Sequence, residues 1–109
     1  MNILIKYNND YLNNNLKDLK LGLSNKLFSA KTNEEAIKII NKQNIEKVFI
    51  EIKVIEEVNF VGYINKYFPK IKVVIITNSH NENILSAINR GSFAIIREPF
   101  TLKKILSNI

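Results

Sequence analysis

The chain has 109 residues and a formal net charge of +6. A chain of this length forms one domain, residues 1–109, and buries roughly 65% of its unfolded surface on folding. It contains no cysteine, which excludes disulfides and thiolate metal sites. The N-terminus is charged too early for a signal peptide, and no apolar stretch reaches the ~20 residues that span a bilayer, so we expect a cytoplasmic protein without membrane contact.

The positive charge raises the question of nucleic-acid binding. The lysines are scattered from Lys6 to Lys104, and the only adjacent pair is Lys103-Lys104. Aromatic residues do not alternate with these lysines along the sequence, as stacking platforms for bases would. The abundance of Ile, Asn and Lys therefore indicates a compositional bias rather than a nucleic-acid surface.

The first part of the chain alternates apolar runs with helical stripes. Residues 3–5 predict a buried strand, and Asp10 then stands where a helix N-cap would. Four leucines follow at helical spacing: Leu12, Leu16, Leu19 and Leu23. Residues 26–30 predict a weak second strand. The next helix begins with Thr32 or Asn33 as its N-cap and carries two glutamates in its first turn, where the helix dipole favours negative charge.

The second part repeats the alternation. Residues 48–50 predict a third strand that ends at Glu51, and residues 54–68 show a helical pattern. Residues 73–76 predict a fourth strand that closes on Thr77. The remaining elements are a helix with Ile84, Leu85 and Ile88 that Gly91 ends, a strand at residues 93–96, and a helix from Thr101. Five alternations of strand and helix predict an α/β fold, a doubly wound parallel sheet with helices on both faces.

The ends of three predicted strands resemble those of response-regulator receiver domains. Glu51 ends the third strand, Thr77 ends the fourth, and Glu98-Pro99-Phe100 follows the fifth. The family carries a phosphate-accepting Asp, a Thr or Ser, and Lys-Pro at these positions. Ala30 before the second helix and Arg90-Gly91 before the fifth strand also match the family. The resemblance implies a flavodoxin-like (CheY-like) five-stranded sheet in the order 2-1-3-4-5.

The resemblance implies a phosphorylation pocket that lacks the charges it needs. The family's acidic Mg²⁺-binding pair falls on Tyr7 and Asn8, which carry no negative charge. Glu51 replaces the phosphate-accepting Asp with a longer side chain, and Glu98 replaces the Lys that contacts the phosphoryl group. We therefore predict a degenerate pocket of Tyr7, Asn8, Glu51, Thr77 and Glu98 that binds no metal or cofactor and accepts no phosphate.

Two interpretations of Glu51 stay open. It is either a rim carboxylate without a role or a permanent charge that imitates the phosphorylated state. Glu51 and Glu98 would repel each other in a shared pocket. Lys6 and Lys53 are the candidate counter-ions, unless both lysines point into water.

The fifth strand also departs from the family. Ile95 stands where active receivers carry the aromatic residue of their switch, and an aliphatic side chain has no polar tip. Thr77 is then either a remnant of the switch or an ordinary strand-end residue. The apolar character of this edge predicts a phosphate-independent homodimer, with a face made by Ile84, Ile88, Phe93 and Ile95.

We predict an atypical receiver domain of two-component signal transduction that acts through protein association. The resemblance implies that it is the N-terminal part of a transcription regulator, which contacts DNA only through an effector domain after Ile109. The alternative is a stand-alone adaptor that binds a signalling partner. A small flavodoxin-like enzyme with Glu51 and Glu98 as an acid/base pair has no further catalytic residues to support it, so we expect a protein that is not an enzyme.

Overall fold

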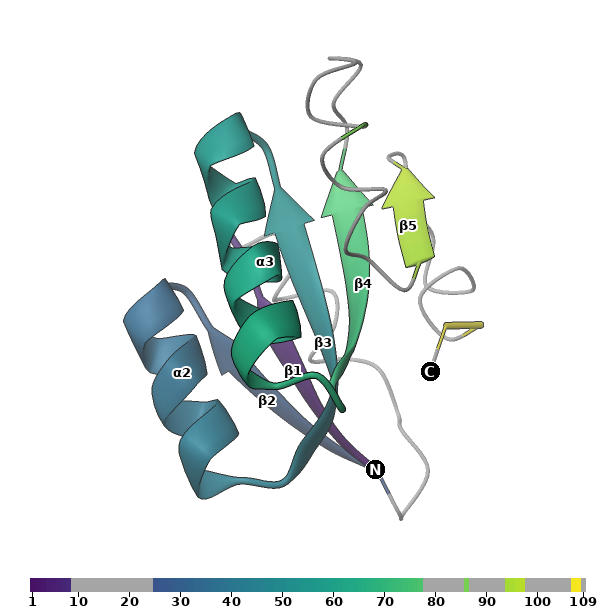
Figure 1. Cartoon of the computed structure of the whole chain (residues 1–109). Coiled ribbons are helices and arrows are strands. Elements are labelled where there is room, and N and C mark those ends of the chain that lie inside the picture. Colours follow the sequence, from purple (N-terminus) through teal and green to yellow (C-terminus); the bar gives the residue numbers. More distant parts are fainter. Residues whose placement is uncertain (9–24, 78–85, 87–93, 98–106, 109) are drawn as a thin grey trace.

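A five-stranded parallel sheet forms the centre of the molecule (Figure 1). The computed structural model describes residues 1–8, 25–77, 86, 94–97 and 107–108. The strands lie in the order β2-β1-β3-β4-β5, which confirms the predicted topology. Their bounds are β1 (Asn2–Lys6), β2 (Lys26–Ala30), β3 (Ile45–Ile52), β4 (Lys72–Thr77) and β5 (Ala94–Arg97).

Two helices, α2 (Asn33–Lys42) and α3 (Val58–Tyr67), cover the same face of the sheet (Figure 1). This α2–α3 face is packed with alternate strand residues that include Leu4, Ile50 and Ile75. The residues between them fill the opposite face, among them Ile5, Phe49 and Val74. Because the strands are buried on both faces, they read as continuous apolar runs in the sequence, as expected for a parallel sheet.

The predicted N-cap of α2 is present. Thr32 precedes the helix, and its hydroxyl oxygen accepts a hydrogen bond from the Glu35 backbone N–H at 3.1 Å. The Glu35 carboxylate reaches back to accept the Lys31 backbone N–H at 3.0 Å. Of the two candidate caps, Thr32 is therefore the one used, and the pair satisfies backbone donors that the first helical turn leaves open.

The start of the third helical region, which the sequence left open, is defined by the structure. A short 3₁₀ helix, η1 (Ile55–Glu57), precedes α3, and the side chains of Val54 and Ile55 are 49% and 46% exposed. The apolar stripe therefore begins at Val58 and not at Val54. The Glu57 carboxylate accepts the Lys53 backbone N–H at 3.1 Å, which accounts for a tight turn here instead of regular helix. Phe68 caps α3 just before Pro69, as predicted.

Several predicted elements lie outside the described residues. These are the helix after Asp10 with its four leucines, the helix that contains Ile84 and Ile88, and the helix from Thr101. Phe93 and Glu98 also lie outside them. Within the part of the chain that is described, no helix has both the length and the apolar character that crossing a membrane requires.

Candidate functional site at the carboxyl ends of the strands

Glu51 is buried inside the sheet. Strand β3 continues for one residue past it, and Glu51 pairs in register with Ile76 of β4, so that only 1% of its surface is exposed. Its Oε1 atom accepts the backbone N–H of Asn8 at 2.6 Å. A buried carboxylate needs such donors, because burial without hydrogen bonds strongly disfavours a charge. Glu51 therefore lies inside the sheet and not at its exposed rim.

Asn8 connects Glu51 to a second carboxylate. The Asn8 side-chain amide donates to both carboxylate oxygens of Glu57, each at 2.8 Å, and lies 3.5 Å from the backbone carbonyl of Glu51. Glu57 in turn accepts the backbone N–H of Lys53. We call Asn8, Glu51, Glu57 and the Lys53 backbone the Asn8 network. It ties the end of β1 to the connection between β3 and α3.

The predicted site residues include Asn8 and Glu51 but not Glu57. A glutamate six residues after Glu51 looked like an ordinary surface residue of a helix start. The sequence feature that could have indicated Glu57 is its position in the turn before α3, where a carboxylate can accept backbone N–H groups. Only the chain path at η1 brings it to Asn8.

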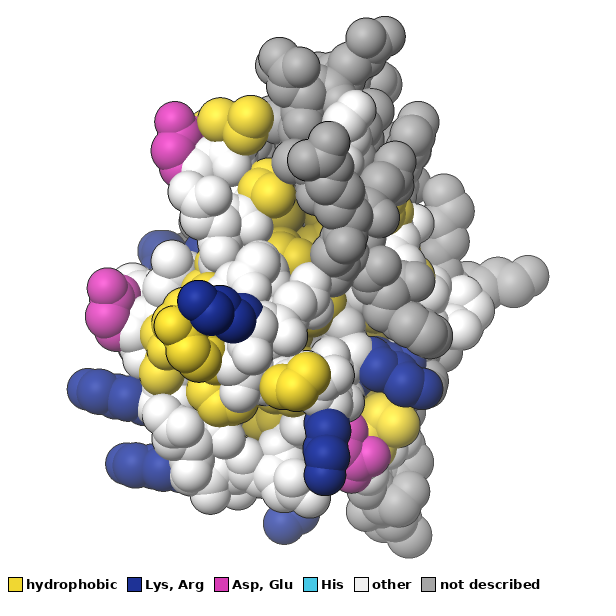
Figure 2. Space-filling view, in the orientation of Figure 1, with side chains coloured by type: hydrophobic (Ala, Val, Ile, Leu, Met, Phe, Trp, Pro, Cys, Tyr) yellow, Lys and Arg dark blue, Asp and Glu magenta, His cyan; other side chains and the backbone are white. Residues whose placement is uncertain are grey.

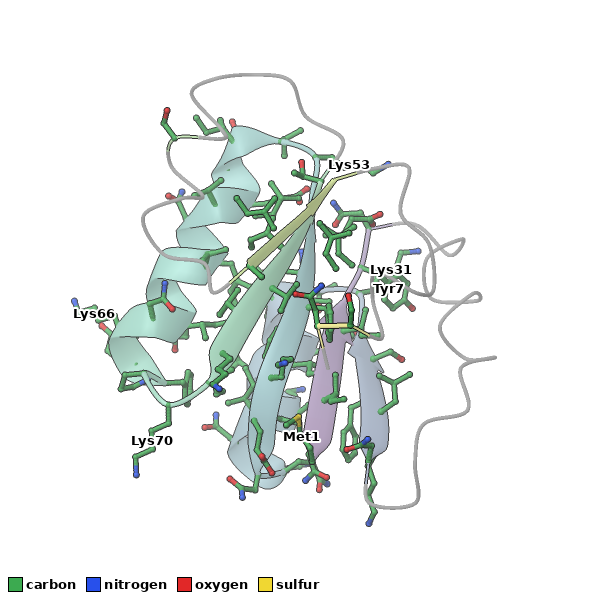
Figure 3. The ribbon with its side chains drawn as sticks, turned by 90° about the vertical axis from the view of Figure 1, so that its right-hand side faces the viewer. Met1, Tyr7, Lys31, Lys53, Lys66 and Lys70 are labelled. Atoms are coloured by element: carbon green, nitrogen blue, oxygen red, sulfur yellow. The ribbon has the colours of Figure 1, made fainter. Side chains whose placement is uncertain are left out.

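The predicted counter-ions are placed differently. Lys6 follows Leu4 on the α2–α3 face, whereas Glu51 follows Phe49 on the opposite face, so alternation along the strands separates the two side chains. The Lys53 side chain is exposed at the carboxyl end of β3 (Figure 3). The Lys53 backbone N–H, and not the side-chain ammonium, donates the hydrogen bond to Glu57.

Tyr7 and Thr77 take structural positions. The Tyr7 backbone N–H donates to the Ala30 carbonyl at 3.0 Å, and its half-buried ring packs on the opposite-face core. The Thr77 side chain is fully buried, and its hydroxyl donates to the Ile52 carbonyl at 2.8 Å. This bond joins β4 to β3. Ile95 is half-buried and packs against the core of the α2–α3 face.

The network does not fit a Mg²⁺ ion. Mg²⁺ needs an octahedral array of oxygen ligands. Here an N–H group occupies Oε1 of Glu51, and the amide of Asn8 directs its donor group at both Glu57 oxygens. Among the described residues, no three or more His, Cys, Asp or Glu side chains come together as metal ligands. The contacts that the described residues make are hydrogen bonds that hold the end of β1 against the connection between β3 and α3.

A second buried charge lies at the other end of β3. Lys47 is 5% exposed, and its ammonium donates to the backbone carbonyl of Asn108. Burial lowers the pKa of Lys47, and the nearby positive charge of Lys72, its register partner, lowers it further. The burial of Lys47 was not predicted from the sequence, because a lysine near the start of a strand usually faces water.

No protein-family model matches the chain, and no curated protein matches it in sequence. Solved structures do match its fold. A CheY-like receiver domain protein from Methanospirillum hungatei JF-1 superimposes with a TM-score of 0.85 at 18% identity, covering 98% of this chain and 88% of that one. A LuxR family DNA-binding response regulator from Silicibacter pomeroyi gives 0.81 at 14% identity, covering 98% and 86%.

NtrX from Brucella abortus, solved in complex with ADP, gives a TM-score of 0.83 at 23% identity, and the match covers 98% of this chain but 24% of NtrX. The fold is therefore that of response-regulator receiver domains, and the fold expected from the strand ends is confirmed.

Proposed function

We propose that this protein is an atypical receiver domain that signals through protein association, without phosphorylation at the usual strand end. The observation that carries the proposal is the Asn8 network. The backbone N–H of Asn8 holds the Glu51 carboxylate at the position where the family carries its phosphate-accepting Asp. Glu51 then acts as a fixed charge in a permanently closed pocket.

The network also supports the loss of metal chemistry. Active receivers use Mg²⁺ to neutralise the incoming phosphoryl group, and the residues at positions 7 and 8 offer a phenol and an amide instead of carboxylates. The amide of Asn8 binds Glu57 and fixes the approach to α3. A hydrogen bond contributes roughly 0.5–1.5 kcal/mol net, and these two bonds share one half-buried amide group. In this proposal the amide takes over the ordering role that the metal has in active receivers.

Intact-mass measurement tests the proposal. After incubation of the purified chain with acetyl phosphate and Mg²⁺, we expect no phosphoryl adduct. The Glu51→Asp variant is the matched control, and it should also stay unmodified, because the acidic pair and the Lys of the family are still missing. A receiver domain with the complete acidic set serves as the positive reaction. A stoichiometric adduct on the unaltered chain would overturn the proposal.

The association part of the proposal is a homodimer. The predicted face includes the half-buried Ile95, while Ile84, Ile88 and Phe93 lie outside the described residues. Sedimentation equilibrium at micromolar concentration, without a phosphodonor, should show a dimer, and Ile88→Asp should shift it to a monomer. A control variant, Lys38→Asp on the exposed side of α2, should leave the dimer intact. A strictly monomeric unaltered chain would favour the adaptor alternative.

We further propose that the chain regulates transcription through a DNA-binding effector domain in the same polypeptide. The support is the similarity of fold to a LuxR family DNA-binding response regulator. Reading the gene downstream of the Ile109 codon tests this directly. A DNA-binding domain in frame supports the regulator, and a stop codon there supports the adaptor.

A further inference from the structure

An open groove of about 300 Å³ lies at the end of the sheet opposite to the Asn8 network. It is formed where α2 leads into β3 and where α3 leads into β4. Its floor is apolar and made by Ile40, Ile45, Phe68 and Ile71. This volume is at the lower end of the range for binding pockets, so the groove has room for one or two apolar side chains.

Exposed aromatic rings continue this apolar surface along α3. Tyr63 and Tyr67 are 39% and 57% exposed, and their ring centroids lie 4.7 Å apart. The Tyr63 ring is also 6.3 Å from that of Phe68, which lines the groove. Figure 2 shows hydrophobic and basic side chains next to one another on the side of the molecule that α2 and α3 form. Tyrosines exposed beside an apolar groove are typical of protein interfaces.

Two exposed lysines accompany the rings. The ammonium of Lys66 lies 5.2 Å from the centroid of the Tyr67 ring, and Lys70 lines the groove itself. Lys66 lies on α3 and Lys70 in the connection that follows it, both far from Lys53 (Figure 3). None of the described residues that line the groove is acidic. The groove therefore combines an apolar floor with a positively charged rim.

We propose that this groove binds an acidic segment of another protein, with an aliphatic or aromatic side chain in the groove and flanking carboxylates at Lys66 and Lys70. The apolar floor matches the anchor residue, and the positive rim matches the flanking charges. The groove lies at the opposite end of the sheet from the Asn8 network, so it adds an interaction surface to the proposed function.

The same observations favour a protein segment over a nucleic acid. Tight nucleic-acid binding uses about 6–10 phosphate contacts, and this rim supplies two lysines. The ammonium of Lys66 already covers the Tyr67 ring, so that ring is not an open platform for a base.

A random 12-residue peptide library displayed on phage tests the proposal against the immobilised full chain. We expect enrichment of peptides that combine Asp or Glu with Leu, Ile, Phe or Trp. The affinity of a fluorescein-labelled enriched peptide should fall at least tenfold in the Lys66→Glu, Lys70→Glu double variant. It should fall at least fivefold in Tyr67→Ser. The Lys31→Glu, Lys38→Glu double variant changes the same charge at exposed residues that do not line the groove and should bind like the unaltered chain.

Circular dichroism and urea midpoints confirm that each variant is folded, which is expected because all the altered side chains are exposed. The proposal is overturned if no acidic peptide is enriched, or if binding is equally strong in the Lys66→Glu, Lys70→Glu variant. It is also overturned if a 20-nucleotide oligo(dT) binds through the same lysines while the acidic peptides do not. None of these outcomes depends on phosphorylation or on dimer formation, so the proposed function is tested separately.

Discussion

At the scale of single residues, a backbone donor contacts the buried carboxylate of Glu51. The sequence led us to Lys6 and Lys53 as partners of Glu51, because charge is what a sequence displays. The group that reaches Oε1 of Glu51 is the backbone N–H of Asn8, which every residue except proline carries. Which backbone donor meets a carboxylate depends on the path of a loop, so this part of the site could not be predicted from residue types.

Asn8 offers a direct test at this scale. Asn8→Ala removes the side-chain bonds to Glu57 and keeps the backbone bond to Glu51, so we expect a loss of about 1 kcal/mol in unfolding free energy. Asn8→Asp places a third carboxylate beside Glu51 and Glu57, and the loss should reach roughly 2–3 kcal/mol at pH 7. Urea midpoints measure both variants.

The pH dependence separates charge repulsion from a lost contact. Protonation of the new carboxyl group removes the repulsion, so the gap between Asn8→Asp and Asn8→Ala should narrow from pH 7 to pH 4.5. If the Asn8→Asp protein is as stable at pH 7 as the unaltered chain, the hydrogen bonds of the Asn8 network do not stabilise the fold.

At the scale of elements, the sequence predicted the features that depend on neighbouring residues, such as the N-cap of α2. The sequence placed the N-cap of α2 at Thr32 or Asn33, and Thr32 is the cap. The sequence left the start of the third helix open, because Val54 and Ile55 continue its apolar pattern. In the structure a short 3₁₀ turn lies there, closed by the bond from the Glu57 N–H to the Val54 carbonyl, and the Glu57 carboxylate accepts the Lys53 N–H. Periodicity could not reveal this, since it records apolar positions and not side-chain bonds to the backbone.

Thr32 carries the element-scale prediction. Thr32→Ala removes the hydroxyl that accepts the Glu35 N–H, and an N-cap loss of this kind costs about 1 kcal/mol of unfolding free energy. Thr32→Ser keeps the acceptor and should be within about 0.5 kcal/mol of the unaltered chain. Thermal or urea unfolding of the two variants measures the difference. Equal losses in both would mean that the methyl group of Thr32, and not its hydroxyl, matters.

At the scale of the whole molecule, the alternation of strands and helices predicted a parallel sheet, and the resemblance of the strand ends to receiver domains implied its order. Apolar runs at regular intervals, helices between them and polar residues at three strand ends all indicate the same parallel arrangement. Lys47 breaks this pattern. Lysines are rarely buried, so nothing in the sequence indicated that Lys47 lies inside the domain. Its partner, the Asn108 carbonyl, is 61 residues away along the chain.

Lys47 should make the stability of the whole domain depend on alkaline pH. Burial and the neighbouring Lys72 charge hold the pKa of Lys47 below its usual value in the folded chain. Between that lowered pKa and the unfolded value of about 10.4, the unfolded chain holds more protons, so stability rises with pH across this window. Below the lowered pKa, the cost of burying the charge is fully present.

Lys47→Met removes this charge, so its urea midpoint should equal or exceed that of the unaltered chain at pH 7 despite the lost bond to Asn108. The difference between the two midpoints should then shift in favour of the unaltered chain as the pH rises to 10. Lys38→Met, which removes an exposed lysine of α2, controls for the change in net charge and should show no such trend. A Lys47→Met advantage that grows with pH would mean that the charged ammonium stabilises the fold, and that its bond to the Asn108 carbonyl outweighs its desolvation.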